Sequence, residues 1–356
     1  MNSYYHMNKN KSIISPNNSI SGFIFFFSIL ILHGCSNKNK QEAAEFFERA
    51  NYHVSINEPD KALGFYTEAI EKVPDFADAY LNRGLIYEKR AMYTEAQADY
   101  QKAVEVDPEF TQAQFSLARI LHIVNRANDS EKILSELSTR YKDSLSYLYL
   151  HAKNLTALNK LDQAQTFFSI AVQKDPKNPE ILNDFGFVYF LQNDLNDAEK
   201  LFLQAIQYTT SNPFPYHNLS VVYALQQKFE AALFNSQKAI ELEPTSGLFQ
   251  SNHGFHLLLN QRSSEAQGHL DKAEKLGYKD SYHLRNKGVF FLQTKNFPEA
   301  IRYLQQAEKE NPDTKLVYYF LGKAYEANQN TKDACLAFKQ GKRLQDNWSD
   351  KLARCP

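Results

Sequence analysis

The sequence predicts an all-α chain in which one helix–turn–helix segment is repeated nine times. Small and apolar residues recur three, four or seven positions apart, which is the spacing of one face of a helix. This pattern returns every 34 residues between residues 43 and 348, without an insertion or deletion. Only 12 Gly and 12 Pro occur among 356 residues, and 43% of the residues are hydrophobic. The composition therefore excludes a loop-rich or disordered chain and allows a continuous apolar interior.

Charge and cysteine content narrow the classes of function. The formal net charge is −1, so the chain lacks the basic excess that is typical of a general nucleic-acid binder. Cys35, Cys335 and Cys355 are its three cysteines, which are too few for a disulfide-dense scaffold. We therefore expect no nucleic-acid partner.

The first 34 residues differ from everything that follows. Lys9 and Lys11 supply positive charge, and no acidic residue occurs before Cys35. The run Ile20–Leu32 is apolar apart from small Ser and Gly residues, but it is shorter than the roughly 20 residues of a membrane span. A charged segment followed by a short apolar segment is typical of a secretory signal peptide, which we predict for residues 1–34.

The end of this segment makes the prediction more specific. Leu32, His33, Gly34 and Cys35 resemble the lipobox of bacterial lipoproteins, although His33 departs from its usual small or apolar residue. The resemblance implies a lipidated Cys35, a polar tether within residues 35–42, and a location in the cell envelope, at the outer membrane facing the periplasm. The alternative is an uncleaved signal anchor in which the cysteine is incidental.

The nine repeats share positions that hold small residues and positions that hold large ones. Gly84 and Gly186 stand at position 8 of their repeats, and Ala96 and Ala198 at position 20, where small side chains let two helices approach closely. Large apolar residues at positions 11 and 24 fill the gaps, and proline often ends the second helix. We number the repeats 1 to 9 in chain order. They span 43–76, 77–110, 111–144, 145–178, 179–212, 213–246, 247–280, 281–314 and 315–348, and a C-terminal cap or tail follows at 349–356.

This pattern resembles that of the tetratricopeptide repeat (TPR) family. The resemblance implies antiparallel helix pairs that stack into a right-handed superhelical solenoid, with a concave groove lined by the first helix of each pair. No single repeat buries its own apolar face, so stability is a sum over neighbouring repeats. Repeat 3 fits least well, with Gln114, Ser130 and Leu137 at positions 4, 20 and 27. It has either drifted or forms a softer joint between the first two and the last six repeats.

The C-terminus suggests a cap and a disulfide. Trp348 and Leu352 lie four residues apart and would form the apolar seam of a capping helix over the last repeat. Cys335 stands at position 21, which in the TPR family faces the following helix, so we expect a possible disulfide between Cys335 and Cys355. Closing a loop of about 20 residues would contribute roughly 3 kcal/mol.

Catalytic motifs are missing from the sequence. It contains no HExxH, Walker, Rossmann or G-x-S-x-G motif. His253 and His256 form an H-x-x-H, but His253 occupies a packing position and no second ligand cluster accompanies the pair. We therefore predict no catalytic residue, metal, cofactor or small-molecule substrate.

The groove is the surface on which we expect binding. In TPR proteins, positions 2, 5, 6, 9, 12 and 13 of each repeat face it, and here positions 5 and 6 carry many amides and other polar groups. Such a ladder can bond an extended peptide backbone, which both donates and accepts along its length. The alternative is that Asn is simply common at position 6. The predicted partner-binding residues are Asn82, Asn183, Asp184, Phe187, His217, Asn218, Ser251, Asn252, Phe255, Arg285 and Asn286.

The sequence thus predicts a membrane-anchored protein–protein interaction scaffold of the bacterial cell envelope. Its partners would be other envelope proteins or peptides held in the groove, and the membrane would hold the lipid anchor. One alternative is a subunit of a polysaccharide-export, secretion or pilus-biogenesis complex, which some TPR lipoproteins resemble. A less favoured alternative is an envelope enzyme with a site in the groove.

Overall fold

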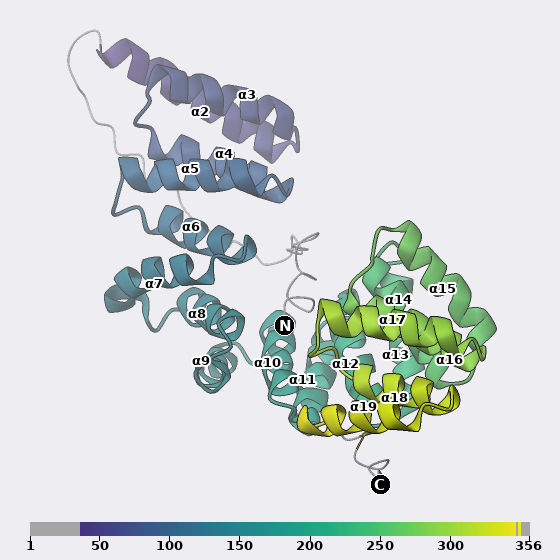
Figure 1. Cartoon of the computed structure of the whole chain (residues 1–356). Helices are drawn as coiled ribbons and strands as arrows, with labels where there is room; N and C mark the ends of the chain where they lie inside the picture. The colour runs from purple at the N-terminus through teal and green to yellow at the C-terminus, as the bar shows by residue number, and fades with distance from the viewer. Residues whose placement is uncertain (1–35, 347, 350–356) are drawn as a thin grey trace. The chain divides into compact units, whose positions relative to one another are not determined.

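The computed structural model describes residues 36–346, 348 and 349, and this part of the chain folds into 18 helices without a strand (Figure 1). The helices form nine consecutive pairs, so the predicted all-α solenoid of TPR-like pairs is confirmed. The helices are α2 (Ser36–Ser55), α3 (Pro59–Lys72), α4 (Ala77–Lys89), α5 (Tyr93–Val106), α6 (Thr111–Ile123), α7 (Ala127–Tyr141), α8 (Leu145–Ala157), α9 (Leu161–Lys174), α10 (Pro179–Leu191), α11 (Leu195–Tyr208), α12 (Pro213–Leu225), α13 (Phe229–Leu242), α14 (Gly247–Leu259), α15 (Ser263–Lys275), α16 (Ser281–Gln293), α17 (Phe297–Glu310), α18 (Val317–Ala327) and α19 (Thr331–Arg343).

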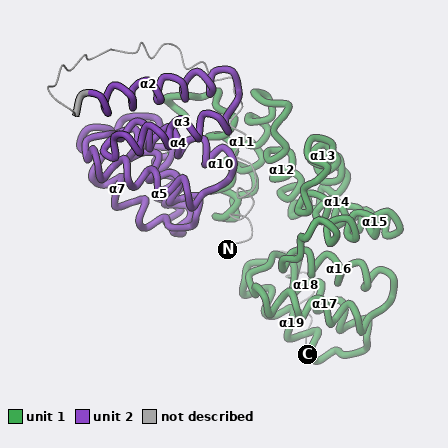
Figure 2. Tube along the Cα trace, turned by 90° about the horizontal axis from the view of Figure 1, so that it is seen from above, with its two compact units in different colours: residues 1–7, 168–356 green, residues 8–167 purple. Residues whose placement is uncertain are grey.

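The chain divides into two compact units between Phe167 and Phe168, within α9 (Figure 2). We call residues 36–167 the N-terminal unit and the described residues from Phe168 onward the C-terminal unit. The division falls in repeat 4, one repeat after the joint that the sequence suggested. The predicted signal peptide, Cys35 and residues 350–356 lie outside the described residues. Within residues 36–346, 348 and 349, no helix has the length and apolar character needed to cross a membrane.

The predicted tether before repeat 1 is helical from Ser36 onward. These residues form the first turns of α2 rather than a separate polar segment. Lys38 and Glu42 form an i,i+4 ion pair at 3.8 Å, and Lys72 Nζ of α3 donates to Glu42 Oε2 at 2.5 Å. Side chains of this kind support a helix at its surface, which explains why the polar composition did not mark a helix boundary.

Helix pairs pack through the small positions that the sequence identified. The alanines Ala96 and Ala198 are completely buried. A Cβ added to Gly84 would lie 2.7 Å from Tyr100 Cε1, and one added to Gly186 would lie 2.8 Å from the equivalent atom of Phe202. In these two repeats, therefore, the missing side chain of the first helix makes room for the large ring of the second.

The turn between the two helices of each repeat has the same backbone geometry throughout. Position 15 is left-handed in all nine repeats, although none of these residues is glycine. At Ala91, the amide N–H donates to Glu88 O at 2.9 Å, and the next amide, that of Met92, donates to Tyr87 O at 2.9 Å. This is a Schellman motif, which ends a helix by bonding its last carbonyls. The left-handed residues are Asn57, Ala91, Asn125, Asn159, Asn193, Gln227, Gln261, Lys295 and Gln329.

Candidate functional site

We first compare one row of equivalent residues, positions 2 and 9 of each first helix, which we call the first-helix row. In the N-terminal unit these positions are exposed or half-buried. In α14 and α16 of the C-terminal unit they are buried, with 1–8% of their surface accessible. The members compared are Asp78, Leu85, Gln112, Arg119, Ser146 and Lys153 in the N-terminal unit, and Leu248, Phe255, Tyr282 and Val289 in the C-terminal unit.

Helix α14 shows how complete the burial is. Every residue from Leu248 to Leu258 is buried, including Gln250, Asn252 and His256. The helix packs against α13 and α15, its neighbours in sequence, and also against the first helices α12 and α16 of the adjoining repeats. A helix that is covered on all sides must find internal partners for its polar side chains. Gln250 does so by donating from Nε2 to Pro244 O at 2.9 Å.

The predicted amide ladder bonds to itself in this region. Asn286 Nδ2 donates to Ser251 O at 3.1 Å and to Ser251 Oγ at 3.0 Å, and Arg285 Nη2 donates to Asn286 Oδ1 at 2.7 Å. The Arg285 guanidinium lies over the Phe255 ring, 4.0 Å from its centroid. These groups form hydrogen bonds with one another inside the protein and are not accessible to a partner.

The prediction of an open groove is therefore wrong for six residues. Neighbouring first helices pack directly on one another here, so the side chains between them become core. The six residues are His217, Ser251, Asn252, Phe255, Arg285 and Asn286, all at most 5% exposed.

The remaining predicted groove residues keep partial access to solvent. Asp184, Phe187 and Asn218 are half-buried, whereas Asn183 is 9% exposed. Asn218 Nδ2 donates to Asn183 Oδ1 at 2.9 Å, and Asn183 Nδ2 donates to Asp184 Oδ1 at 3.2 Å. In the N-terminal unit Asn82 is half-buried. Partner binding by these five residues stays a prediction.

A tryptophan from the chain end closes the C-terminal unit. Trp348 Nε1 donates to Leu225 O, 123 residues away in sequence, at 3.2 Å. Its ring lies 5.7 Å from Phe229 and 5.2 Å from Tyr319 between centroids, and it is 7% exposed. The sequence predicted that Trp348 would cap the last repeat together with Leu352. Trp348 does pack on the last repeat, through Tyr319 of α18. It also contacts repeat 6, because the indole N–H finds a carbonyl at the end of α12. Leu352 lies outside the described residues.

Arg119 of the first-helix row forms an ion pair with the buried carboxylate of Glu88, which the sequence did not predict. Glu88 is 5% exposed, accepts from Tyr100 Oη at 2.6 Å and forms an ion pair with Arg119 of the next repeat. Lys153 of α8 lies 5.2 Å from the centroid of the Tyr149 ring. The charged residues at position 9 of repeats 3 and 4, Arg119 and Lys153, could have predicted an acidic partner nearby, because charged side chains are rarely buried without a partner.

The histidines of the C-terminal unit are structural. His253 Nδ1 lies 2.9 Å from Ser236 Oγ, and burial lowers the pKa of His253 to about 4. His256 is 1% exposed, and burial holds its pKa well below the usual value. Both ring nitrogens of His217 are buried without a hydrogen-bond partner among the described residues, and burial lowers its pKa to about 3. No group of three metal-ligating side chains occurs in the described part of the chain.

The predicted disulfide involves a residue beyond the described part of the chain. Cys335 lies in α19, and Cys355 falls among residues 350–356. The Cys335–Cys355 pairing stays a prediction.

Comparison with family models gives the same repeat in most of the chain. Models described as tetratricopeptide repeat match residues 47–91, 77–110, 155–220, 215–246, 256–309 and 291–347. The unmatched stretch 111–154 contains repeat 3, the repeat that fits the sequence pattern least well.

Curated relatives and one solved structure share parts of this architecture. A UDP-N-acetylglucosamine–peptide N-acetylglucosaminyltransferase of Giardia intestinalis is 30% identical over 115 residues, 32% of this chain and 8% of that protein. The DnaJ protein P58IPK homolog B of Oryza sativa subsp. japonica is 22% identical over 185 residues, 47% of this chain and 39% of that protein. The chain thus spans less than half the length of either relative. The Cut9–Hcn1 structure matches 88% of this chain and 75% of its own, with a TM-score of 0.58 and 16% identity, which shows the fold alone.

Proposed function

Because this chain belongs to the tetratricopeptide repeat family, we propose that it is a protein–protein interaction scaffold that binds its partner on the first-helix row of the N-terminal unit. One observation carries this choice. The equivalent positions are exposed or half-buried in α4, α6 and α8 but are core residues in α14 and α16. A partner can therefore reach the row in the N-terminal unit without unfolding any part of the chain. The protein acts by binding and does not turn over a substrate.

The chemistry of this row favours an extended, acidic peptide segment. Lys153 in the row and Lys89 beside it bring positive charge, whereas Arg119 is paired with Glu88 and Asp78 adds one carboxylate. Asn82 adds an amide that can both donate to and accept from a peptide backbone. Charge complementarity of this kind selects a partner and speeds its association more than it adds affinity.

Capture from an envelope extract tests this surface. The double variant Lys89→Glu/Lys153→Glu should lose at least 90% of the partner that the wild-type chain retains, because two attractive charges become repulsive. Lys160→Glu, an exposed turn residue of the same unit, is the matched control and should retain the partner. Circular dichroism must show all three proteins folded. Equal recovery by the double variant would exclude this row as the partner site.

We further propose that a lipid at Cys35 holds the scaffold to the membrane of the bacterial envelope. The support is the lipobox-like sequence Leu32–Cys35 behind a short apolar segment. Helix α2 begins at Ser36, so the anchor would place the first repeat at the membrane surface. Mass spectrometry of the membrane-extracted protein should find a diacylglyceryl group on Cys35. A Cys35→Ala variant should leave the membrane fraction, and an unmodified Cys35 in a membrane-bound protein would contradict the anchor.

A further inference from the structure

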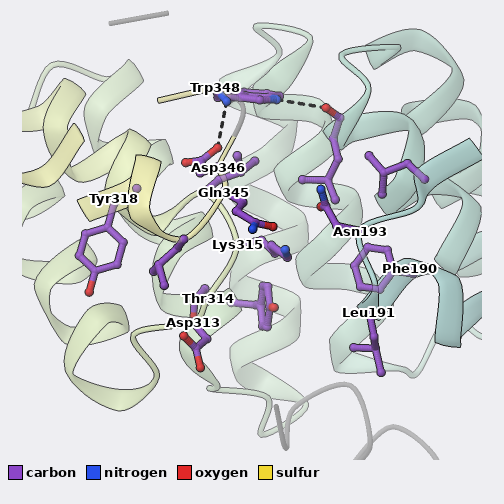
Figure 3. A pocket seen from close by; sticks show the side chains of 16 residues that line it. Phe190, Leu191, Asn193, Asp313, Thr314, Lys315, Tyr318, Gln345, Asp346 and Trp348 are labelled. Atoms are coloured by element: carbon purple, nitrogen blue, oxygen red, sulfur yellow. Dashed lines mark hydrogen bonds between the residues drawn. The ribbon is translucent and has the colours of Figure 1, made fainter. Parts of the chain in front are cut away.

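The C-terminal unit contains a cavity that the proposed function does not use. It has a volume of about 230 Å³ and is bounded by the ends of α10 and α12, the segment before α18, and the residues that follow α19 (Figure 3). Phe190, Leu225, Tyr282 and Trp348 contribute apolar walls. The volume lies below the roughly 300–1,000 Å³ of pockets for drug-sized ligands, so it suits one or two amino-acid residues.

Three polar side chains point into the middle of this cavity. Asn193, Lys315 and Gln345 converge there from three different segments of the C-terminal unit (Figure 3). None of the three side-chain ends has a hydrogen bond or ion pair within residues 36–346, 348 and 349. Arg285 Nη1 donates to Lys315 O at 2.8 Å and thereby fixes the backbone from which the ammonium extends.

An acidic group balances the charge of Lys315. Asp346 lines the same cavity and accepts from the backbone N–H of Trp348 at 3.0 Å and from Ser349 Oγ at 2.9 Å. Burial lowers the pKa of Lys315 and raises that of Asp346, while the charge of each partly offsets the shift of the other. Asp313, the remaining charged residue of the lining, is exposed at the rim. The interior thus offers one strong donor, one strong acceptor and two amides.

We propose that this cavity is a second binding site, which takes an uncharged peptide amide beside an apolar side chain. The amide oxygen would accept from the Lys315 ammonium, and the amide N–H would donate to Asp346. Asn193 and Gln345 would bond the neighbouring peptide unit, and the aromatic walls would cover the side chain. A neutral ligand is favoured because an added charge of either sign would meet a like charge in a partly desolvated space. The site is independent of the row proposed in the N-terminal unit.

Trp348 makes the cavity directly observable, because it is the only tryptophan of the chain and forms part of the wall. N-acetyl-L-leucinamide carries two amides and one apolar side chain, and we expect it to change the tryptophan emission saturably with a Kd on the order of 1 mM. N-acetyl-L-leucine and L-leucinamide, which carry a negative and a positive charge, should each bind at least tenfold more weakly. Lys315→Met and Asp346→Asn should each weaken the neutral ligand at least tenfold. Lys339→Met, at an exposed position of α19, should leave its affinity unchanged.

A second measurement uses the wild-type chain, so it does not depend on whether a variant folds. Acetylation by a lysine-directed reagent, mapped by mass spectrometry, should slow at least fivefold at Lys315 when N-acetyl-L-leucinamide saturates, and should stay unchanged at Lys339. The absence of a saturable emission change together with unprotected Lys315 would overturn the site. Tighter binding of either charged analogue would overturn the proposed amide chemistry. Neither result would affect partner capture through Lys89 and Lys153.

Discussion

The two units use one repeat pattern but treat the same positions differently. Position 6 holds asparagine in both, yet Asn82 in α4 of the N-terminal unit is half-buried, as is Asn218 in α12, whereas Asn286 in α16 of the C-terminal unit is completely buried. Their neighbours explain the difference. At position 9, α6 and α8 have Arg119 and Lys153, which are half-buried, whereas α14 has Phe255, which is 3% exposed and lies under the Arg285 guanidinium of α16. A repeat position therefore fixes where a side chain points, and the residues around it decide whether water reaches it.

The largest difference in stability between the units should follow from the loss of Trp348. Trp348→Ala removes a side chain that is 7% exposed, and we expect it to lower the free energy of unfolding of the C-terminal unit by about 3–5 kcal/mol. Hydrogen exchange should speed up in α12 and α18 and remain unchanged in α4 and α6. Phe234→Ala, at a ring that is 62% exposed, is the control and should change stability by less than about 0.5 kcal/mol. Faster exchange in α4 and α6 as well would show that loss of Trp348 also destabilises the N-terminal unit.

The two asparagines provide a matched pair. Asn286→Ala removes the oxygen that accepts from Nε and Nη2 of the buried Arg285 guanidinium, and we expect a loss of about 2–3 kcal/mol. The same substitution at the half-buried Asn82 should cost less than about 0.5 kcal/mol, as most surface changes do. Urea unfolding monitored by circular dichroism measures both losses. Equal losses would mean that position 6 has the same role in both units.

The buried histidines should make the C-terminal unit sensitive to acid. The pKa of His217 falls to about 3 in the folded chain, below the ordinary value of about 6.5, so the unfolded chain binds more protons between these values. Stability is therefore lost as the pH falls from about 7 toward 3, by about 2 kcal/mol for His217 alone between pH 7 and pH 5. His217→Leu should remove this share of the pH dependence and raise stability at pH 7, because its ring nitrogens lack partners among the described residues. Unfolding curves at the two pH values test this, and an unchanged slope with pH would contradict it.

The smallest expected change in stability concerns the left-handed turn residue, which both units share. Ala91 in the N-terminal unit and Gln261 in the C-terminal unit are both left-handed, with φ near 60°. Replacing either with glycine relieves this strain, and we expect each variant to gain about 1 kcal/mol. Thermal unfolding should therefore give similar shifts for Ala91→Gly and Gln261→Gly. Clearly different shifts would show that the turns, like the first-helix row, depend on the unit.

The sequence predicted the regular features because they repeat. Gly84 and Ala96 stand at positions whose role recurs nine times, so the helix pairs and their close packing followed from spacing alone. The left-handed turns were missed because asparagine, glutamine, lysine and alanine share position 15, and their side chains give no common signal. The backbone geometry there comes from the ending of one helix and the start of the next.

Closure of the C-terminal unit was missed although a signal was present. Leu248 and Tyr282 stand at position 2, where the N-terminal unit has Gln112 and Ser146. Phe255 was predicted to contact a partner, whereas it packs against the chain itself. The contact of Trp348 with Leu225 O joins residues three repeats apart. Such a contact depends on how small rotations add up along the solenoid, which a repeating pattern does not encode.

The most direct test compares side-chain access at one position in both units. In a background with Cys35, Cys335 and Cys355 changed to serine, a single cysteine replaces Ser146 or Leu248, both at position 2. Maleimide labelling of the folded Ser146→Cys protein should be about 100-fold faster than that of Leu248→Cys, because the latter must wait for local opening. Both should react equally fast in denaturant. Equal rates in the folded proteins would contradict a row that is open in the N-terminal unit and closed at α14 and α16 of the C-terminal unit.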